Sequence, residues 1–364
     1  MSTLFDIWNT IQYKLFPWLE EELDPLTEKE QQFVQVISLI DLRTHTQPYC
    51  WRGIGRKRES RVSIAKAFIA KAVYNFETTE ILIEYLHSCK NLRRLCGWEM
   101  KNQIPSAPTF SRAFAEFSEG QLPQKIHEVM IKQHYHPKVA GHVSRDSSAI
   151  AAREKPKKKD KIAVSLPKRK PGRPGKEDIL PPKPPKRLDV QPTRSLLENL
   201  YELPSACDVG MKKDSKGLKT SWVGYKLHLD CVDGGIPVSS ILTSASLHDS
   251  QAAIPLAQMT AERIINFYDI MDSAYDAPQI KSHSRSLGHV PIIDANRRRG
   301  DKISMDPATQ RRFGERSTVE RVYSALKDNY GCDKIRVKGP TKVMSHLMFG
   351  IIALTATQLF RLLL

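Results

Sequence analysis

The sequence contains few cysteines, and none of them form the closely spaced pairs that bind zinc. It has no CxxC motif, whereas zinc sites are built from ligand pairs at short spacing. We therefore predict no zinc site and interpret the cysteines as reduced thiols of a cytosolic protein. The six are Cys50, Cys89, Cys96, Cys207, Cys231 and Cys332.

Long apolar runs and a leader peptide are also absent. The most apolar stretch, residues 347–360, is shorter than the ~20 residues that span a bilayer, so we interpret it as part of a buried helix. Residues 1–20 have no basic start, apolar centre or small-residue cleavage site. We expect neither a membrane span nor a secretory signal.

Acidic residues are in deficit. The 364 residues include 56 Lys and Arg against 40 Asp and Glu, a net charge of +16. This excess favours a polyanionic partner, either nucleic acid or an anionic membrane surface. The length suggests two domains, or one large domain with additions.

Much of the positive charge is concentrated in one segment. Residues 155–187 hold 13 Lys or Arg, three acids and eight prolines, so we predict an exposed basic insertion without fixed structure at about 155–190. Residues 168–176 loosely resemble an AT-hook, in which Arg173 would enter the minor groove of DNA. The composition favours the simpler alternative, a solvated loop that makes nonspecific phosphate contacts.

Residues 1–136 are predicted to be helical. Thr27 and Glu30 have the spacing of a capping box, and residues 78–86 place apolar side chains at helical spacing. Short helices separated by basic residues are typical of a DNA-binding module. A bundle used only for packing or dimerisation fits the pattern equally well.

Residues 137–364 change to a mixture of strands and helices. Residues 221–229 alternate in polarity, and Gly234 and Gly235 form a turn before a second strand at 236–245. Further short strands are predicted at 266–271 and 289–293, with helices at 318–329 and 341–363. This order predicts an α/β fold, a mixed sheet flanked by helices.

Two aspartates occupy positions where a carboxylate needs an explanation. Asp272 follows a short apolar strand, at the edge where open α/β sheets place their sites; an N-cap for the next helix is the alternative. Asp146 lies within a predicted strand at 141–150, where burial is costly unless the carboxylate is paired or binds metal. A salt bridge to a neighbouring helix is the competing interpretation.

Glu320 is predicted to lie on a helix between two cations. With Phe313, Arg316, Tyr323 and Lys327 it shares one helical face. This pattern is compatible with a metal ligand flanked by phosphate-binding groups. The spacing by itself favours a plain ladder of ion pairs.

Four segments together resemble bacterial insertion-sequence transposases with a DDE catalytic triad. The most specific is 316–327, because many relatives carry Tyr-x2-Arg-x3-Glu-x6-Lys, which Phe313, Arg316, Glu320 and Lys327 fit with Phe in place of Tyr. Residues 106–112 are similar to the end of the family's helical N-terminal region. The other three segments are 146–148, 224–228 with 242–250, and 271–276.

The resemblance implies an RNase H-like catalytic domain in residues 137–364. It implies that Asp146, Asp272 and Glu320 hold two Mg²⁺ ions, for which Mn²⁺ could substitute, and that Arg316 and Lys327 grip the DNA backbone. His248 and Asp249 are interpreted as shaping a turn and a helix start rather than binding metal. Further phosphate contacts, with ordinary surface charge as the alternative, are predicted for Lys226, Arg297 and Arg298.

The implied partners are double-stranded DNA, namely the terminal inverted repeats of the element and the target, and a second copy of the chain. The implied location is the bacterial cytoplasm, at the nucleoid when bound. Two alternatives stay open: a catalytically inactive, transposase-derived DNA-binding protein, and a nuclease that only hydrolyses. Convergence of the three carboxylates would speak against the first.

Overall fold

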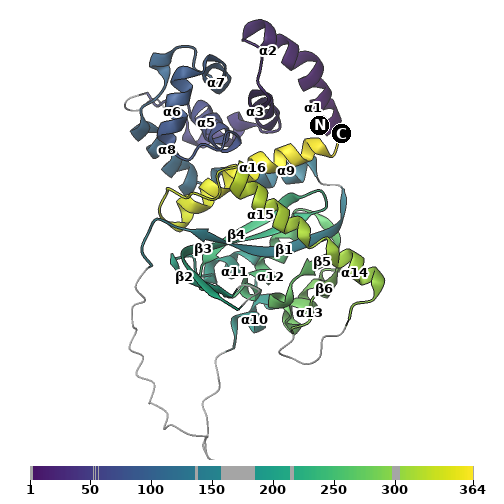
Figure 1. Cartoon of the computed structure of the whole chain (residues 1–364). Helices are drawn as coiled ribbons and strands as arrows, with labels where there is room; N and C mark the ends of the chain where they lie inside the picture. The colour runs from purple at the N-terminus through teal and green to yellow at the C-terminus, as the bar shows by residue number, and fades with distance from the viewer. Residues whose placement is uncertain are drawn as a thin grey trace, which may run out of the picture.

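The structure is a computed structural model that describes residues 3–51, 53, 55, 57–135, 138–156, 185–213, 217–296 and 304–363. A helical region lies on one side, and a mixed sheet with its own helices lies on the other (Figure 1). Three residues predicted to contact DNA, Arg173, Arg297 and Arg298, lie outside the described residues.

The helical region packs around α5 (Arg61–Val73). Buried alanines on this helix, among them Ala65 and Ala67, let neighbouring helices approach closely. The Phe68 ring contacts those of Phe114 and Phe349. The other elements are α1 (Leu4–Thr10), η1 (Ile11–Leu15), α2 (Phe16–Glu22), α3 (Glu28–Ser38), α4 (Leu42–Thr46), η2 (Gln47–Tyr49), α6 (Thr79–Ser88), α7 (Lys90–Cys96), η3 (Lys101–Gln103), α8 (Ala107–Glu119) and α9 (Leu122–His134).

The predicted capping box at the start of α3 is confirmed. The Thr27 side chain accepts from the backbone N–H of Glu30, and the Glu30 carboxylate accepts from the backbone N–H of Thr27 at 2.8 Å. Two of the N–H groups that a helix start leaves without partners are thereby satisfied.

The described sheet has six strands and confirms the predicted mixed α/β class. β1 (Val139–Ala151) pairs antiparallel with β3 (Lys219–Val232) and parallel with β5 (Ile265–Met271). The first part of β3 pairs with β2 (Asp208–Lys213), and the remainder pairs with β4 (Ile236–Ser244). β6 (Val290–Ile293) continues the sheet beyond β5, so the order is β2-β3-β1-β5-β6 with β4 also on β3.

Helices cover both faces of this sheet (Figure 1). On one face α12 packs on β3 and β4, and on the other α15 packs on β1 and β3. The remaining elements near the sheet are η5, α13 and α14, followed along the chain by α16. Bounds in chain order are α12 (Ser250–Ala261), η5 (Ser273–Tyr275), α13 (Pro278–Ser286), α14 (Pro307–Gly314), α15 (Ser317–Asn329) and α16 (Pro340–Arg361).

The last helix, α16, joins the two regions. It packs on β4 on one side and on α3, α5, α8 and α9 on the other, and one hydrophobic cluster runs through all of them. Among the described residues it alone has the length and composition of a membrane span, and 78% of that window is buried. This burial agrees with the predicted buried helix. The helical region and the sheet therefore share a core rather than folding around two separate ones.

Structure resumes earlier than predicted after the basic insertion. The segment at about 155–190 was expected to have no fixed structure, yet α10 (Arg187–Val190) lies inside it, followed by η4 (Gln191–Thr193) and α11 (Leu196–Glu202). Leu188 packs against a small buried cluster, and Asp189 accepts a hydrogen bond from Gln279 at 2.7 Å. These contacts with residues far along the chain stabilise a segment whose composition alone does not predict order.

A buried ion pair connects the central strands. The guanidinium of Arg145 donates two hydrogen bonds of 2.7 Å to the carboxylate of Asp230, and neither side chain is more than 2% exposed. Asp230 also accepts from the Thr260 hydroxyl of α12 at 2.6 Å. The pair thus connects β1, β3 and α12 on one face of the sheet.

Removing one member of this pair should destabilise the fold far more than removing both. Arg145→Met leaves a buried carboxylate without a partner, so we expect a loss of about 3–5 kcal/mol in the free energy of unfolding. The double variant Arg145→Met, Asp230→Leu buries no charge and should lie within about 1–2 kcal/mol of the wild type, mostly from the unpaired Thr260 hydroxyl. Urea titration followed by circular dichroism measures both. A double variant as unstable as the single one would contradict this account.

Candidate active site

Strand β1 presents alternate residues to α15 and to the turn that precedes this helix. Ser144 Oγ donates to the carbonyl of Glu315 at 2.8 Å, and Lys327 Nζ donates to Ser148 Oγ at 2.8 Å. Between them, the buried Tyr323 hydroxyl lies 2.9 Å from the carbonyl oxygen of Asp146. Because side chains alternate along a strand, Asp146 lies on the α15 side, opposite to Arg145.

Asp272 follows the last residue of β5. Arg145 pairs with Met271 in the parallel register between β1 and β5, so the next residues along, Asp146 and Asp272, lie beside each other. Asp272 Oδ1 accepts from the backbone N–H of Ala274 at 2.9 Å and caps η5. The sequence left two interpretations of Asp272 open, a site residue at the end of a strand and a helix cap. In the structure Asp272 both follows the strand and caps η5.

These two carboxylates lack sufficient positive charge nearby. The pKa of Asp146 is raised to about 6, mainly by burial and also by the neighbouring Asp272, whereas the hydrogen bond from the N–H of Ser147 and the charge of Arg316 oppose the rise. Burial also raises the pKa of Asp272. Within the part of the chain that the structure describes, the one cation that forms an ion pair with either carboxylate is Arg316, whose Nη1 lies 3.9 Å from Asp146 Oδ2. Two neighbouring, half-buried carboxylates with raised pKa values are suited to bind a cationic ligand.

Glu320 lies close to this pair but does not join it. Its side chain is 52% exposed, and it accepts from Arg316 Nη2 at 2.5 Å. Arg316 therefore lies between Asp146 and Glu320. Within the described ranges no three Asp, Glu, His or Cys side chains come close enough together to hold a metal ion.

The predicted helical face around Glu320 is interrupted. Phe313 belongs to α14, which ends at Gly314, and α15 begins at Ser317 with Arg316 in the N-cap position. The periodicity predicted that Phe313 and Glu320 share one helical face. The structure instead places them on two different helices. The predicted ladder is also incomplete, since Arg316 pairs with Glu320 but Lys327 donates to β1.

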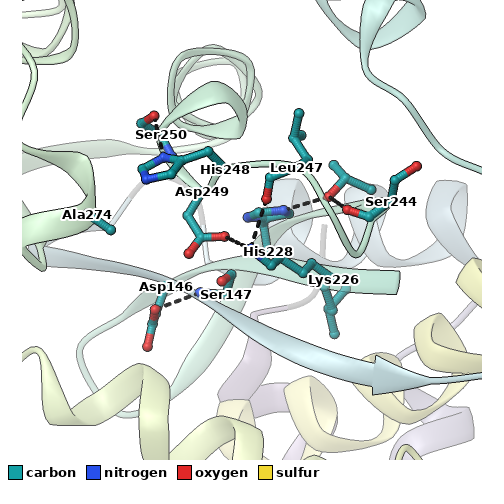
Figure 2. Close-up of polar contacts among 12 residues, drawn as sticks. Asp146, Ser147, Lys226, His228, Ser244, Leu247, His248, Asp249, Ser250 and Ala274 are labelled. Carbon is teal, nitrogen blue, oxygen red and sulfur yellow. Dashed lines mark hydrogen bonds and ion pairs between the residues drawn. The ribbon is translucent and has the colours of Figure 1, made fainter. Parts of the chain in front are cut away.

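Lys226, which was predicted to contact a DNA phosphate, makes its contacts inside the protein in this structure. Its side chain is 15% exposed, and its ammonium donates to Asp249 Oδ1 and to the carbonyl of Leu247, both at 2.8 Å (Figure 2). The Lys226 ammonium is therefore paired inside the protein, because the fold brings Asp249, 23 residues further along the chain, into contact with it.

Asp249 is the site residue that sequence reasoning missed. It was interpreted as a helix start, but at the N-cap position of α12 its side chain makes no capping hydrogen bond. Burial raises its pKa, yet the charge of Lys226 and the hydrogen bonds from Lys226 and Ser147 help to hold the pKa below its ordinary value. Its negative charge in turn raises the pKa of both Asp146 and Asp272.

A buried neutral histidine lies near Asp249. Burial lowers the pKa of His228 to about 4, and its Nε2 lies 2.9 Å from the Thr243 hydroxyl. In the sequence, the cluster of Lys226, His228 and Asp249 was indicated only by the family resemblance of segments 224–228 and 242–250. The pairing between them becomes visible only when β3 and β4 are side by side.

Comparisons with known families agree with this arrangement. Residues 205–356 match a family model described as a transposase DDE domain, and residues 21–116 match one described as a transposase domain, DUF772. Asp272 and Glu320 lie within the first match, whereas Asp146 precedes it, on the other side of the basic insertion. No curated protein matches the chain.

The raised pKa of Asp146 has a consequence for stability. The folded protein binds the proton more tightly than the unfolded chain, in which the pKa is about 3.9, so stability falls as pH rises from about 4 to about 6. Asp146→Asn removes this loss, and without divalent cations the variant should be more stable than the wild type at pH 7 by about 1–3 kcal/mol.

Urea unfolding of both proteins in EDTA, between pH 4 and pH 7, measures the difference. Asp328→Asn, an exposed substitution on α15, should follow the wild type throughout. A gap between wild type and Asp146→Asn that does not change with pH would exclude an elevated pKa.

Proposed function

Because the chain belongs to the insertion-sequence DDE transposases, an enzyme family with an RNase H-like fold, we propose that it cuts DNA at the ends of its own element and joins those ends to target DNA. The substrates would be the terminal inverted repeats and a target duplex. A net charge of +16 supports a polyanionic substrate.

The observation that carries the proposal is the adjacent pair Asp146 and Asp272. Two neighbouring carboxylates with raised pKa values, and one cation at 3.9 Å, form a site that lacks positive charge. Carboxylate oxygens are the ligands that Mg²⁺ prefers. The family generally uses divalent metal ions, and the donor set of this site fits them.

Two such ions, Mg²⁺ or Mn²⁺, would activate the attacking oxygen and stabilise the leaving oxygen of the phosphodiester. The residues of the chain hold the ligands in place. Tyr323 bonds the Asp146 carbonyl and so fixes β1 against α15, and the N–H of Ala274 orients the Asp272 carboxylate.

Glu320 is proposed as the third ligand, available once Arg316 has another partner. In the free protein Arg316 pairs with Glu320 and lies near Asp146. A DNA phosphate is a strong bidentate partner for a guanidinium, so binding of the element end would draw Arg316 away. Glu320 is exposed and on a helix, and its side chain is then free to turn toward the aspartates. Lys327 adds a second cation beside Ser148.

We further propose that the chain acts as a homodimer on two element ends, in the bacterial cytoplasm and at the nucleoid when bound. Two ends have to be processed together for joining, and a dimer supplies two equivalent sites. The competing proposal is a nuclease that stops at hydrolysis. The two differ in whether the freed 3′-OH becomes the next nucleophile.

Substitution of Asp272 should separate cleavage from binding. Asp272→Asn keeps the size and the capping oxygen but removes the charge, so we expect a loss of strand cleavage of about 10³-fold or more, with binding of the element end within about threefold of the wild type. Labelled end duplexes in Mg²⁺ report cleavage, and gel shifts in EDTA report binding.

The matched control is Asp328→Asn, an exposed carboxylate at the other end of the helix that carries Glu320. It should cleave at the wild-type rate. Retained cleavage by Asp272→Asn would sink the assignment of the site.

Strand joining should require the terminal hydroxyl. Pre-cut end duplexes with a 3′-OH are expected to join to a supercoiled plasmid in Mg²⁺, whereas the same ends with a 3′-deoxy terminus should not, because no attacking oxygen is present. Joined products are counted by gel. Cleavage without any joining of 3′-OH ends would favour the hydrolytic nuclease.

A further inference from the structure

A cavity of about 630 Å³ lies where the helical region meets the segments that cover the sheet. One side of its wall comes from α5, α6 and α8, and the other from the chain after β1, the chain after α15 and the first turns of α16 (Figure 1). Its volume is typical of ligand-binding cavities. None of the residues that line it belongs to the carboxylate site.

Lys71 brings a buried positive charge to this wall. Its side chain is 8% exposed, and its ammonium donates to the carbonyl of Glu77 at 3.2 Å. Two of its three donors have no partner, and it forms no ion pair with an acidic side chain in the part of the chain that the structure describes. Burial lowers its pKa to about 8, so the ammonium is still charged at pH 7. Buried charges are normally paired, and this one is therefore suited to an anion.

Two exposed arginines line the same cavity. Arg153, directly after β1, has no hydrogen bond or ion pair with any residue that the structure describes. Arg336 pairs with Glu77, and Glu77 also pairs with Lys334 at 3.5 Å. Because the carbonyl of Glu77 is the acceptor for Lys71, one glutamate serves three cations and cannot neutralise them all.

A second, smaller cavity extends this one toward α15. It has a volume of about 150 Å³ and shares Glu77 and Gly331 with the first. Lys327 lines it and donates to β1, and Lys327 follows Glu320 on α15 by seven residues, about 10 Å along the helix. We call the two cavities together the junction groove. Its walls carry five cations (Lys71, Arg153, Lys327, Lys334, Arg336) and three carboxylates (Glu77, Glu80, Asp333).

We propose that the junction groove binds the phosphate backbone of the element end at a distance from the cut, with Lys71 and Arg153 as the residues that contact phosphate. This inference rests on the proposed function and deepens it, because it states where the bound duplex lies beyond the carboxylates. Contacts to phosphate position the duplex without reading its sequence.

The length of α15 sets the distance between this contact and the cut. Tyr330, in the wall of the larger cavity, follows Glu320 by ten residues, about 15 Å along the helix. One DNA strand advances about 3.4 Å per nucleotide. The phosphate in the groove therefore lies about four or five nucleotides from the bond that is cut.

Charge removal in the full-length protein tests the contact. Lys71→Met keeps an apolar stem in the wall and buries no charge, and Arg153→Gln changes an exposed side chain, so circular dichroism should show both variants folded. Each should weaken binding of end duplexes in EDTA about 10-fold and reduce the slope of log K against log salt by about 0.9, and the double variant by about 1.8. Lys90→Gln removes an exposed charge of α7 outside the groove and should keep the wild-type slope.

Neutral methylphosphonate linkages give the position of the contact. A linkage about four or five nucleotides from the cut should weaken binding by the wild type and leave the double variant unaffected. Equal losses in both proteins at every position would overturn the proposal. So would an unchanged salt slope in the double variant, which is the result expected if Lys71 only holds the Glu77 carbonyl.

A free phosphate is the other source of the same chemistry. Calorimetric titration with inorganic phosphate should show no binding that depends on Lys71 or Arg153. Phosphate binding that the double variant loses, together with an unchanged linkage scan, would assign the groove to a small anion and overturn the proposal. Should the wild type show the expected scan but not cut the ends, the proposed cleavage fails while the groove contact stands.

Discussion

The buried ion pair between Arg145 and Asp230 is the interaction on which the arrangement of the site depends. Arg145 precedes Asp146 in β1, and its partner across the parallel pairing, Met271, precedes Asp272. Holding Arg145 on the α12 face turns Asp146 to the α15 face. A slip of one residue would expose the guanidinium and bury a lone carboxylate, so the pair also enforces the register.

The site keeps most of its cations engaged with its own acceptors and still leaves Asp146 and Asp272 short of positive charge. Such a pair opposes folding in the absence of a cation, because each carboxylate is partly desolvated beside a like charge. The surrounding structure tolerates this locally unfavourable site because α16 joins the helical region and the sheet in one core. Unfavourable charge at a site that awaits ligands is typical of active sites.

Local patterns predicted the elements better than the contacts between them. The capping box at Thr27 depends on residues three apart, and the strand end at Asp272 is visible in the apolar run before it. The helix predicted at 318–329 matches α15, but the face around Glu320 was wrongly extended back to Phe313, because an apolar and basic periodicity continues across Gly314. Asp249 was interpreted as a helix start and does precede α12, but no local pattern indicates its pairing with Lys226 on β3.

By itself the sequence determined the charge of the protein, the mixed α/β class with a helical region before it, and the carboxylates Asp146, Asp272 and Glu320 as candidates. These depend on composition and on neighbours within a few residues. Only the tertiary structure decided that Lys226 is paired with Asp249 and that Arg316 lies between Asp146 and Glu320. Those outcomes depend on which strands lie side by side, and a charge acts through space on whatever the fold brings near it.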